Sequence, residues 1–529
     1  MGIPSYFSSV VKKHGAILKP LNSYKPMFFN NLYMDCNSII YDAVRDIEPL
    51  TINFEMKLIN AVIQVIENYI KLISPSNTIY IAFDGVAPFA KMNQQRTRRF
   101  KGDFMAKNTF ISNTNVDSWS TANITPGTNF MNNLSRIVTS HFALKERLYG
   151  VNKIIVSASD IRGEGEHKIF QYIREVNNKD ENILLYGLDS DLIMLTIFNR
   201  QYYNKGYIFR EAPSFMSVTS DIKPEDKEPY VVDIEGMCEQ LVIEMDCCVS
   251  EFRRVYDYVF ICFLLGNDFL PHFPGLNIRT HGIDTLMTIY RKRIGNKPNL
   301  FIIKDDKTIN WRVFKLLIRD IAESEHNYIL DEYKSRDRLS NKHWKIETEK
   351  EREYAFNSIP VIDRNLEYYI CPNEPFWERR YYKSLVNCDV DVCSLRNVCN
   401  NYIEGLEWTL KYYCSECPNW KWTYKYDYPP LFVDLLAHLP DFSMEFIQPN
   451  FDSFSHELQL SYVLPPSKWD LLPTNVRDYL VLNHPDLYND KMEFKWAFCK
   501  YFWEAHVHSG DIPIEMLEDW NTKFISMRS

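Results

Sequence analysis

Hydrophobic and polar positions alternate regularly over the first half of the chain. Short β-like apolar runs occur at residues 32–34, 78–83, 153–156 and 183–186. Amphipathic helical patterns lie near residues 53–73, 88–106, 127–147 and 165–177. Strands alternating with helices in this way are typical of a parallel sheet covered by helices. The pattern therefore predicts an α/β fold whose ligand crevice lies at the carboxyl ends of the strands.

Acidic side chains follow five of the apolar segments. The seven carboxylates are Asp35, Asp84, Glu164, Glu166, Asp189, Asp191 and Asp268. Glycine is scarce, with 17 in the chain, and glycines cluster beside these acids at positions 85, 163, 165, 187 and 266. Because the carboxyl ends of parallel strands meet at one edge of a sheet, we expect the acids to share one cavity.

Carboxylates held close together repel one another, and they stay ionised at neutral pH mainly when a cation neutralises them. Oxygen ligands favour a hard ion, so the acids predict a magnesium or manganese site. Two such ions about 4 Å apart promote phosphodiester hydrolysis. The alternative is that each acid is a solvated loop residue or a helix cap, the usual role of a single one. Seven together favour the metal site.

A basic segment follows Asp84 directly. Lys91, Gln95, Arg98 and Arg99 stand at positions i, i+4, i+7 and i+8, which places them on one face of a predicted helix. Long cations with an amide between them suit a terminal phosphate, through forked and charge-assisted hydrogen bonds. A solvated basic helix face is the alternative. The neighbouring acids favour the phosphate pocket.

Composition limits the class of protein. The chain has 529 residues, 46% of them hydrophobic, and a net charge of −9, so any contact with nucleic acid must depend on a local basic patch. It contains no run of eighteen apolar residues and no apolar leader, so we expect a soluble, intracellular protein. A strongly charged stretch at 333–353 predicts a domain boundary, with residues 1–340 before it and an aromatic-rich region, 341–529, after it.

Long motifs along the chain resemble the XRN family of 5′-to-3′ exoribonucleases. They are Met1-Gly-Ile-Pro, NLYMDCNSII (31–40), IAFDGVAPFAKMNQQRTRRF (81–100), ITPGT (124–128), GEGEHKI (163–169), YGLDSDLIML (186–195) and LLGNDFLPHFP (264–274). Segments 405–430 and 464–473 resemble the second conserved region of the family. The resemblance implies a PIN-like, FEN-related nuclease core over 1–340, and a mostly helical second region over 341–529 that packs on the core and completes the active site.

The resemblance also implies roles for individual residues. It assigns metal ligation, by two Mg²⁺ or Mn²⁺ ions, to the seven acids. It assigns the 5′-monophosphate of the substrate to Lys91, Gln95, Arg98 and Arg99. Tyr41 stands where the family usually has a histidine that stacks on a base opposite a tryptophan, for which Trp420 and Trp422 are the candidates. Phe89 stands where the family commonly has arginine, which puts one contact to the RNA backbone in question.

The leading hypothesis is a magnesium-dependent, processive 5′-to-3′ exoribonuclease that degrades single-stranded RNA with a 5′-monophosphate, such as decapped mRNA, to mononucleotides. The alternatives are a flap-type DNA nuclease and a catalytically silent RNA-binding scaffold. Residues 275–282 match poorly the glycine-rich helical hairpin expected of the DNA enzyme, and all seven acids are present.

We expect a cytoplasmic monomer that does not contact a membrane, with the nucleus as the alternative location and a decapping enzyme as a candidate partner. The chain is expected to be a minimal form of the family. Its abundance of Asn, Ile, Tyr and Lys is typical of an AT-rich genome such as that of a large DNA virus.

Overall fold

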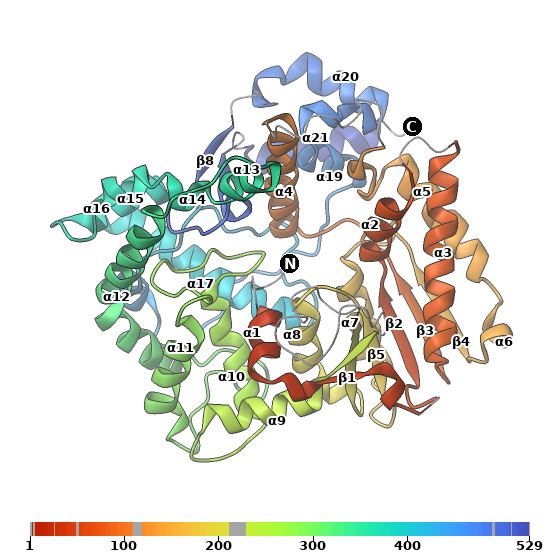
Figure 1. Cartoon of the computed structure of the whole chain (residues 1–529), viewed down its shortest axis with the longest axis horizontal. Helices are drawn as coiled ribbons and strands as arrows, with labels where there is room; N and C mark the ends of the chain where they lie inside the picture. The colour runs from red at the N-terminus through yellow and green to blue at the C-terminus, as the bar shows by residue number, and fades with distance from the viewer. Residues whose placement is uncertain are drawn as a thin grey trace.

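Seven strands form the central sheet of the protein (Figure 1). The computed structural model describes residues 3, 6–25, 27–48, 52–108, 119–210, 229–488, 492–508, 510 and 512–527. The strands are β1 (Leu18–Pro20), β2 (Asn31–Asp35), β3 (Thr78–Ala82), β4 (Lys153–Ser157), β5 (Ile183–Tyr186), β6 (Gly206–Arg210) and β7 (Tyr230–Asp233). Their order is β1-β7-β6-β5-β2-β3-β4. The strands from β6 to β4 are parallel, whereas β7 is antiparallel to both of its neighbours.

Helices cover both faces of the sheet. Leu32 and Met34 of β2 pack in one hydrophobic cluster with α2 (Asn37–Asp46), α3 (Phe54–Ile73) and α5 (Asn129–Phe142). Tyr33 points to the opposite face. That face is covered by α1 (Tyr6–Lys13), α7 (Gly165–Val176), α8 (Asp191–Phe198), α9 (Ile234–Met245) and α10 (Arg253–Cys262). Because both faces are buried, the strands consist mainly of apolar residues, as the sequence pattern showed.

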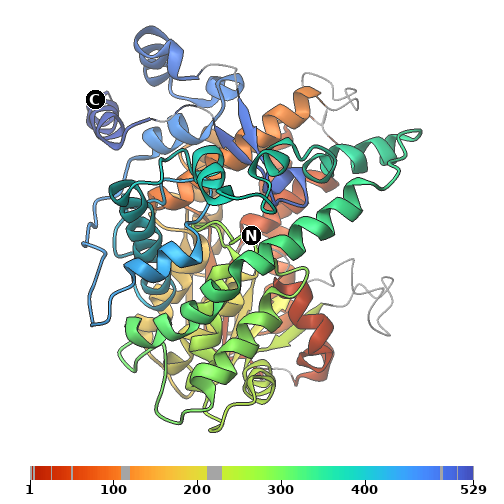
Figure 2. The same ribbon diagram turned by 90° about the vertical axis from the view of Figure 1, so that its left-hand side faces the viewer.

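The second half of the chain is mainly helical. It contains α11 (Gly282–Tyr290), α12 (Trp311–Ser340), α13 (Glu349–Asn357), α14 (Ile359–Ile362), α15 (Asn365–Ile370), α16 (Trp377–Tyr381), α17 (Val392–Cys414), α18 (Phe432–His438), α19 (His456–Val463), α20 (Thr474–Asn483) and α21 (Ile514–Ser526). A two-stranded sheet is formed by β8 (Glu493–Lys495) and β9 (His506–His508). Figure 2 shows the long helix α12 crossing the molecule diagonally.

Two helices join this second half to the sheet. Helix α17 (cyan in Figure 1) runs from the side of α12 toward α8, and its apolar residues belong to the same hydrophobic cluster as the sheet. Helix α4 (Phe89–Asn108) stands at the centre of Figure 1 and packs in a separate cluster with α19, α20 and α21. The second region therefore encloses α4 on the side away from the sheet.

The predicted α/β fold, with a mainly parallel sheet flanked by helices and a helical second region packed on it, is confirmed. The periodicity did not reveal β1, β6 or β7, because short strands at or near a sheet edge carry little pattern. The helix expected over 127–147 is interrupted, since Leu144 has a φ of 60° and α6 (Glu146–Tyr149) begins after it. The charged stretch contains the end of α12 and the start of α13, and the division near residue 340 stays a prediction. Residues 1, 2 and 4 of the N-terminal motif lie outside the described residues.

Candidate active site

A cavity of about 260 Å³ lies at the carboxyl ends of the parallel strands. One wall carries acidic side chains from the ends of β2 and β5, the segment after β3 and the start of α7. The opposite wall is formed by α4. The lining residues include Asp35, Asn37, Tyr41, Asp84, Lys91, Gln94, Gln95, Arg98, Arg99, Glu164, Glu166 and Asp189. Of the eleven predicted metal and phosphate ligands, only Asp191 and Asp268 lie outside this lining, and Asp268 contacts the lining residue Lys91 at 2.9 Å.

Asp35 and Asp84 reach the cavity from neighbouring strands. Asp35 is the last residue of β2, and Asp84 follows the end of β3 by two residues. Asn37 braces this pair, because its side chain donates to Oδ2 of Asp84 at 2.5 Å and accepts from the Asp84 amide at 3.1 Å. The Gly165 amide donates to the other Asp84 oxygen at 2.7 Å. Asn37 was not predicted as a site residue, although it follows a strand-terminal acid directly in the sequence.

Glu164 and Glu166 stand at the beginning of α7. Glu164 is the N-terminal cap residue of the helix, and Glu166 lies in its first turn. Both side chains are buried, with 4% and 5% of their surface exposed. A Glu–Gly–Glu sequence at a helix start directs the two carboxylates into the sheet edge, and the intervening Gly165 lets the helix approach β2 closely.

The last three acids come from two other segments, the start of α8 and the segment after α10. Asp191 is the first residue of α8, and Asp189 precedes it in the segment after β5. Asp268 follows Gly266, whose φ of 86° is a left-handed conformation that favours glycine. Asn267 stabilises this turn, since its side chain accepts hydrogen bonds from the amides of residues 269 and 270, each at 2.9 Å.

The acids repel one another across the site. Burial, together with the charges of Asp84 and Asp189, raises the pKa of Asp35 well above its usual range. Burial and then the charge of Asp191 do the same to the pKa of Glu166. Burial and the charge of Asp268 raise the pKa of Asp191 to about 7. Each raised pKa reflects a free-energy cost of ionising that carboxyl group, which a bound cation would offset.

Lys91 supplies positive charge inside the acidic cluster. Its Nζ lies 2.5 Å from Oε2 of Glu164 and 2.9 Å from Oδ2 of Asp268. Although burial opposes ionisation, the Lys91 ammonium lowers the pKa of Asp268 to about 2. Lys91 thus contacts both the acids and the cavity where the phosphate was predicted. In this arrangement of the described residues, no three Asp, Glu, His or Cys side chains converge as a ready-made metal site.

The donor set nevertheless fits a hard divalent cation. Three buried carboxylate oxygens, Oδ1 of Asp35, Oε2 of Glu166 and Oδ1 of Asp191, have no hydrogen-bond partner among the described residues. Buried carboxylate oxygens without a partner are costly. Oxygen-only ligands of this kind suit Mg²⁺ or Mn²⁺, which the sequence predicted.

The cationic wall of the cavity follows the predicted face of α4. Gln95 is buried, and its Oε1 has no partner within the described part of the chain. Arg99 donates to the carbonyl oxygen of Ile124 at 3.1 Å. Burial lowers the pKa of Arg99 to about 10, so its guanidinium stays charged at neutral pH. Arg98 is exposed, and Gln94, which the spacing argument did not select, also lines the cavity.

The opposite face of α4 is fixed by the second region. The Tyr462 hydroxyl donates to the side chain of Asn93, whose amide donates to the Thr423 hydroxyl at 2.6 Å. Arg96 donates to the carbonyl oxygen of Tyr462 at 2.5 Å and lies 4.4 Å from the centre of the Phe100 ring. Because these contacts hold the back of the helix, its cationic face is directed at the cavity.

The predicted stacking residues are not brought together. Tyr41 lines the cavity, but Trp420 and Trp422 do not, and they are only 9% and 8% exposed. Trp422 stacks on Trp408 with ring centres 5.3 Å apart. The guanidinium of Arg162 lies 4.8 Å from the centre of the Trp420 ring. The stacking role of these residues therefore stays a prediction.

Phe89, which departs from the family pattern, is a packing residue. It is 5% exposed, and its ring contacts Phe454 and Tyr462 at centre-to-centre distances of 5.8 and 5.2 Å. Its amide also donates to the carbonyl oxygen of Trp420 at 2.9 Å. This aromatic contact anchors the first turn of α4 on the second region.

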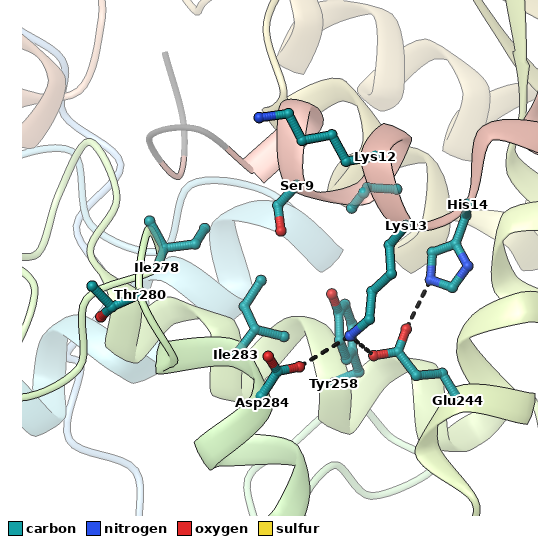
Figure 3. Close-up of a pocket in the computed structure, with 11 residues that line it drawn as sticks. Ser9, Lys12, Lys13, His14, Glu244, Tyr258, Ile278, Thr280, Ile283 and Asp284 are labelled. Carbon is teal, nitrogen blue, oxygen red and sulfur yellow. Dashed lines mark hydrogen bonds and ion pairs between the residues drawn. The ribbon is translucent and has the colours of Figure 1, made fainter. Parts of the chain in front are cut away.

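A second cavity, of about 270 Å³, lies between α1, α9, α10 and α11 (Figure 3). Lys13 reaches into it and pairs with both Glu244 and Asp284. His14 contacts the same Glu244 carboxylate at 2.8 Å. Because these charges pair with one another directly, this cavity lacks the separate acidic and cationic walls of the cavity beside α4.

Family models match most of the chain. The model of the XRN 5′-3′ exonuclease N-terminus matches residues 1–212, and the model of the Xrn1 helical domain matches residues 250–368 and 370–505. These matches, on an α/β fold with an acidic cavity beside a cationic helix, define an enzyme of the nuclease class. The chain belongs to the XRN family of 5′-3′ exonucleases.

Curated relatives extend over nearly the whole chain. The "5′-3′ exoribonuclease 2" of Gallus gallus is 26% identical and aligns with 96% of this chain and 68% of its own length. The "5′-3′ exoribonuclease 1" of Saccharomyces cerevisiae is 26% identical over 90% of this chain and 40% of its own length. The solved catalytic core of Rad2 in complex with DNA has 13% identity and a TM-score of 0.30, over 55% of this chain and 70% of that one. That similarity is too slight to bear on the fold.

Proposed function

We propose that the protein is a Mg²⁺- or Mn²⁺-dependent 5′-3′ exoribonuclease that degrades single-stranded RNA carrying a 5′-monophosphate to mononucleotides. The observation that carries the proposal is one cavity with carboxylates on one wall and the cationic face of α4 on the other. A terminal phosphate on α4 would place the first phosphodiester of the strand beside the acids. The names of the curated relatives support RNA as the substrate.

The seven predicted acids are the residues that would hold two ions. They are Asp35, Asp84, Glu164, Glu166, Asp189, Asp191 and Asp268. When bound, such ions activate a water molecule and stabilise the leaving oxygen of a phosphodiester. The protein's own part is to hold the carboxylates in a buried cluster. The hydrogen bonds from Asn37 and from the Gly165 amide to Asp84 link the segments after β2 and β3 and the start of α7.

The cationic wall supports selection of the 5′ end. Lys91, Arg98 and Arg99 provide charged donors, and Gln95 provides an amide, so a monophosphate would gain several charge-assisted hydrogen bonds. A 5′-hydroxyl would leave these donors unpaired. We propose that the additional phosphates of a cap or triphosphate are not accommodated beside Tyr41 and Arg99, which line the same cavity. Release of one nucleotide and an advance of the strand by one step would give processive digestion.

The source of the RNA, the oligomeric state and the cellular location are also part of the proposal. A decapping reaction upstream would supply the 5′-monophosphate, and we propose that the enzyme acts as a monomer in the cytoplasm. None of the helices in the described ranges is long and apolar enough to cross a membrane.

The test uses one 3′-labelled single-stranded RNA with a 5′-monophosphate, a 5′-triphosphate or a 5′-hydroxyl, in Mg²⁺ and in chelator. We expect loss of the monophosphorylated RNA alone, without intermediates and only with metal. Equal cleavage of all three would contradict the phosphate pocket, and cleavage in chelator would contradict the metal site. A single-stranded DNA of the same sequence tests the flap-type alternative, and no cleavage of any substrate would favour the scaffold.

A further inference from the structure

Two consecutive tyrosines of the second region reach the acidic cluster. Tyr412 and Tyr413 lie near the end of α17, more than 200 residues along the chain from the acids they contact. Both are buried, with 3% and 1% of their surface exposed. The mechanism proposed above gives neither residue a role, and neither carries charge that could bind phosphate.

Tyr412 makes three contacts with segments that carry predicted ligands. Its hydroxyl donates to Oε1 of Glu164 at 2.7 Å. Its ring stacks on His167, the neighbour of Glu166, with centres 3.6 Å apart and planes 19° from parallel. The ring also meets the edge of Phe269, the neighbour of Asp268, at 5.6 Å. One side chain therefore links two segments, the start of α7 and the segment around Asp268, which together carry three predicted ligands.

Tyr413 contacts both ends of α8. Its hydroxyl hydrogen-bonds to the Asp191 carboxylate. Its backbone carbonyl accepts from the Asn199 side chain at 3.0 Å, which ties α17 to the other end of α8. Since Oδ1 of Asp191 has no partner among the described residues, the tyrosine occupies the other oxygen and leaves Oδ1 available.

We propose that Tyr412 and Tyr413 are positioning residues, which orient the Glu164 and Asp191 carboxylates for the metal ions of the proposed function. Each hydroxyl holds one carboxylate oxygen and so fixes the orientation of that carboxylate. The second oxygen of Glu164, Oε2, faces the Lys91 ammonium at 2.5 Å, whereas Oδ1 of Asp191 has no partner among the described residues. Partners of this kind behind the ligands typically change metal affinity by about 10- to 100-fold. The helical second region thereby contributes directly to the geometry of a site whose ligands all come from the first region. The inference depends on that metal site being real.

The test compares Tyr412→Phe and Tyr413→Phe with Tyr424→Phe. Each change keeps the ring and removes one buried hydroxyl. The Tyr424 hydroxyl lies away from the acids and donates to the backbone carbonyl of Tyr428 at 2.9 Å. Mn²⁺ binding is followed by electron paramagnetic resonance, stability by thermal unfolding in chelator, and cleavage by kcat and KM. We expect Tyr412→Phe and Tyr413→Phe to weaken Mn²⁺ binding about tenfold and to lower kcat with little change in KM. Tyr424→Phe should leave Mn²⁺ affinity unchanged.

A double-mutant cycle separates positioning from a general effect on folding. In a Glu164→Gln background, Tyr412→Phe should cause almost no further loss of Mn²⁺ affinity, because the hydroxyl acts through that carboxylate. Additive losses, or wild-type Mn²⁺ affinity in both tyrosine variants, would overturn the positioning role alone. Failure of the wild-type protein to bind Mn²⁺ would overturn the metal site, and the positioning role with it.

Discussion

A Cβ atom added to Gly165 would lie 2.5 Å from Oδ1 of Asp35. A side chain at this position would displace the Asp35 carboxylate or the helix, so glycine lets α7 approach the end of β2 without moving either. This contact brings the carboxylates on either side of Gly165 next to those of the sheet. The packing of one helix start against one strand end therefore decides whether the acids share a site.

Replacing this glycine should break the site. Gly165→Ala forces Asp35 or α7 to shift, and we expect a loss of about 1–3 kcal/mol of unfolding free energy and of most cleavage activity. Gly102→Ala in α4 is the matched control, because nothing lies within 4 Å of its added Cβ. That change should preserve activity and raise the unfolding free energy by up to about 1 kcal/mol, because alanine has the higher helix propensity. Chemical denaturation measures the stability of both variants, and RNA digestion measures their activity. A fully active Gly165→Ala variant would contradict the need for α7 to approach β2 closely.

Removing two acids should abolish cleavage without unfolding the protein. Asp189→Ala together with Asp191→Ala removes two proposed ligands and also relieves repulsion, since the charge of Asp268 helps to raise the pKa of Asp191. We expect no detectable digestion, loss of the thermal stabilisation that Mg²⁺ provides, and an unchanged far-ultraviolet circular dichroism spectrum. Asp441→Ala, at a side chain that is 72% exposed, is the control. Retained cleavage in the double variant would exclude the metal site.

The cationic wall should determine which 5′ end is accepted. Arg98→Gln with Arg99→Gln removes charged donors while keeping polar side chains of similar reach. A hydrogen bond to a charged group contributes about 1.5–3 kcal/mol, so the preference for a monophosphate over a hydroxyl should fall by about tenfold or more. The measurement is the ratio of kcat/KM on the two RNAs. Lys107→Gln, near the exposed end of the same helix, should leave that ratio unchanged, and an unchanged ratio in the double variant would contradict the pocket.

A buried glutamate far from the site should make stability depend on pH. Burial raises the pKa of Glu325 to about 8, although its carboxylate accepts from the amides of Phe432 and Val433 at 2.8 and 3.3 Å. The pKa of Glu325 is higher in the folded state than in the unfolded state. Its contribution to stability is therefore fully present below about pH 4. The contribution is lost as the pH rises from the unfolded pKa to about 8, by about 1.4 kcal/mol of unfolding free energy per pH unit.

Glu325→Gln keeps one oxygen, which can accept the shorter hydrogen bond from the Phe432 amide, but does not titrate. Its unfolding free energy should therefore fall less steeply than that of the wild type between about pH 5 and 8. Denaturant titrations at several pH values measure the difference in slope. Glu445→Gln, at a side chain that is 67% exposed, should follow the wild type. Parallel curves for Glu325→Gln and wild type would show that Glu325 keeps an ordinary pKa.

Local pattern was sufficient for much of the fold. The strands that carry acids, and helices such as α3 and α4, could be predicted because apolar spacing reflects which face of an element is buried. The acids and the cationic face could be selected for the same reason, since their positions relative to those elements are set within a few residues. The structure places four members of that face, Lys91, Gln95, Arg98 and Arg99, on one cavity wall.

Other features depend on contacts between distant parts of the chain. The sequence by itself determined the strands and helices that carry the acids and the cationic face, because these properties depend on neighbours within one or two turns. Only the tertiary structure decided that the Lys91 ammonium lies between Glu164 and Asp268, and that Tyr412 reaches Glu164. It also decided that Trp422 packs on Trp408 and does not line the cavity. Such pairings follow from how helices of the second region pack against the sheet, which no local periodicity records.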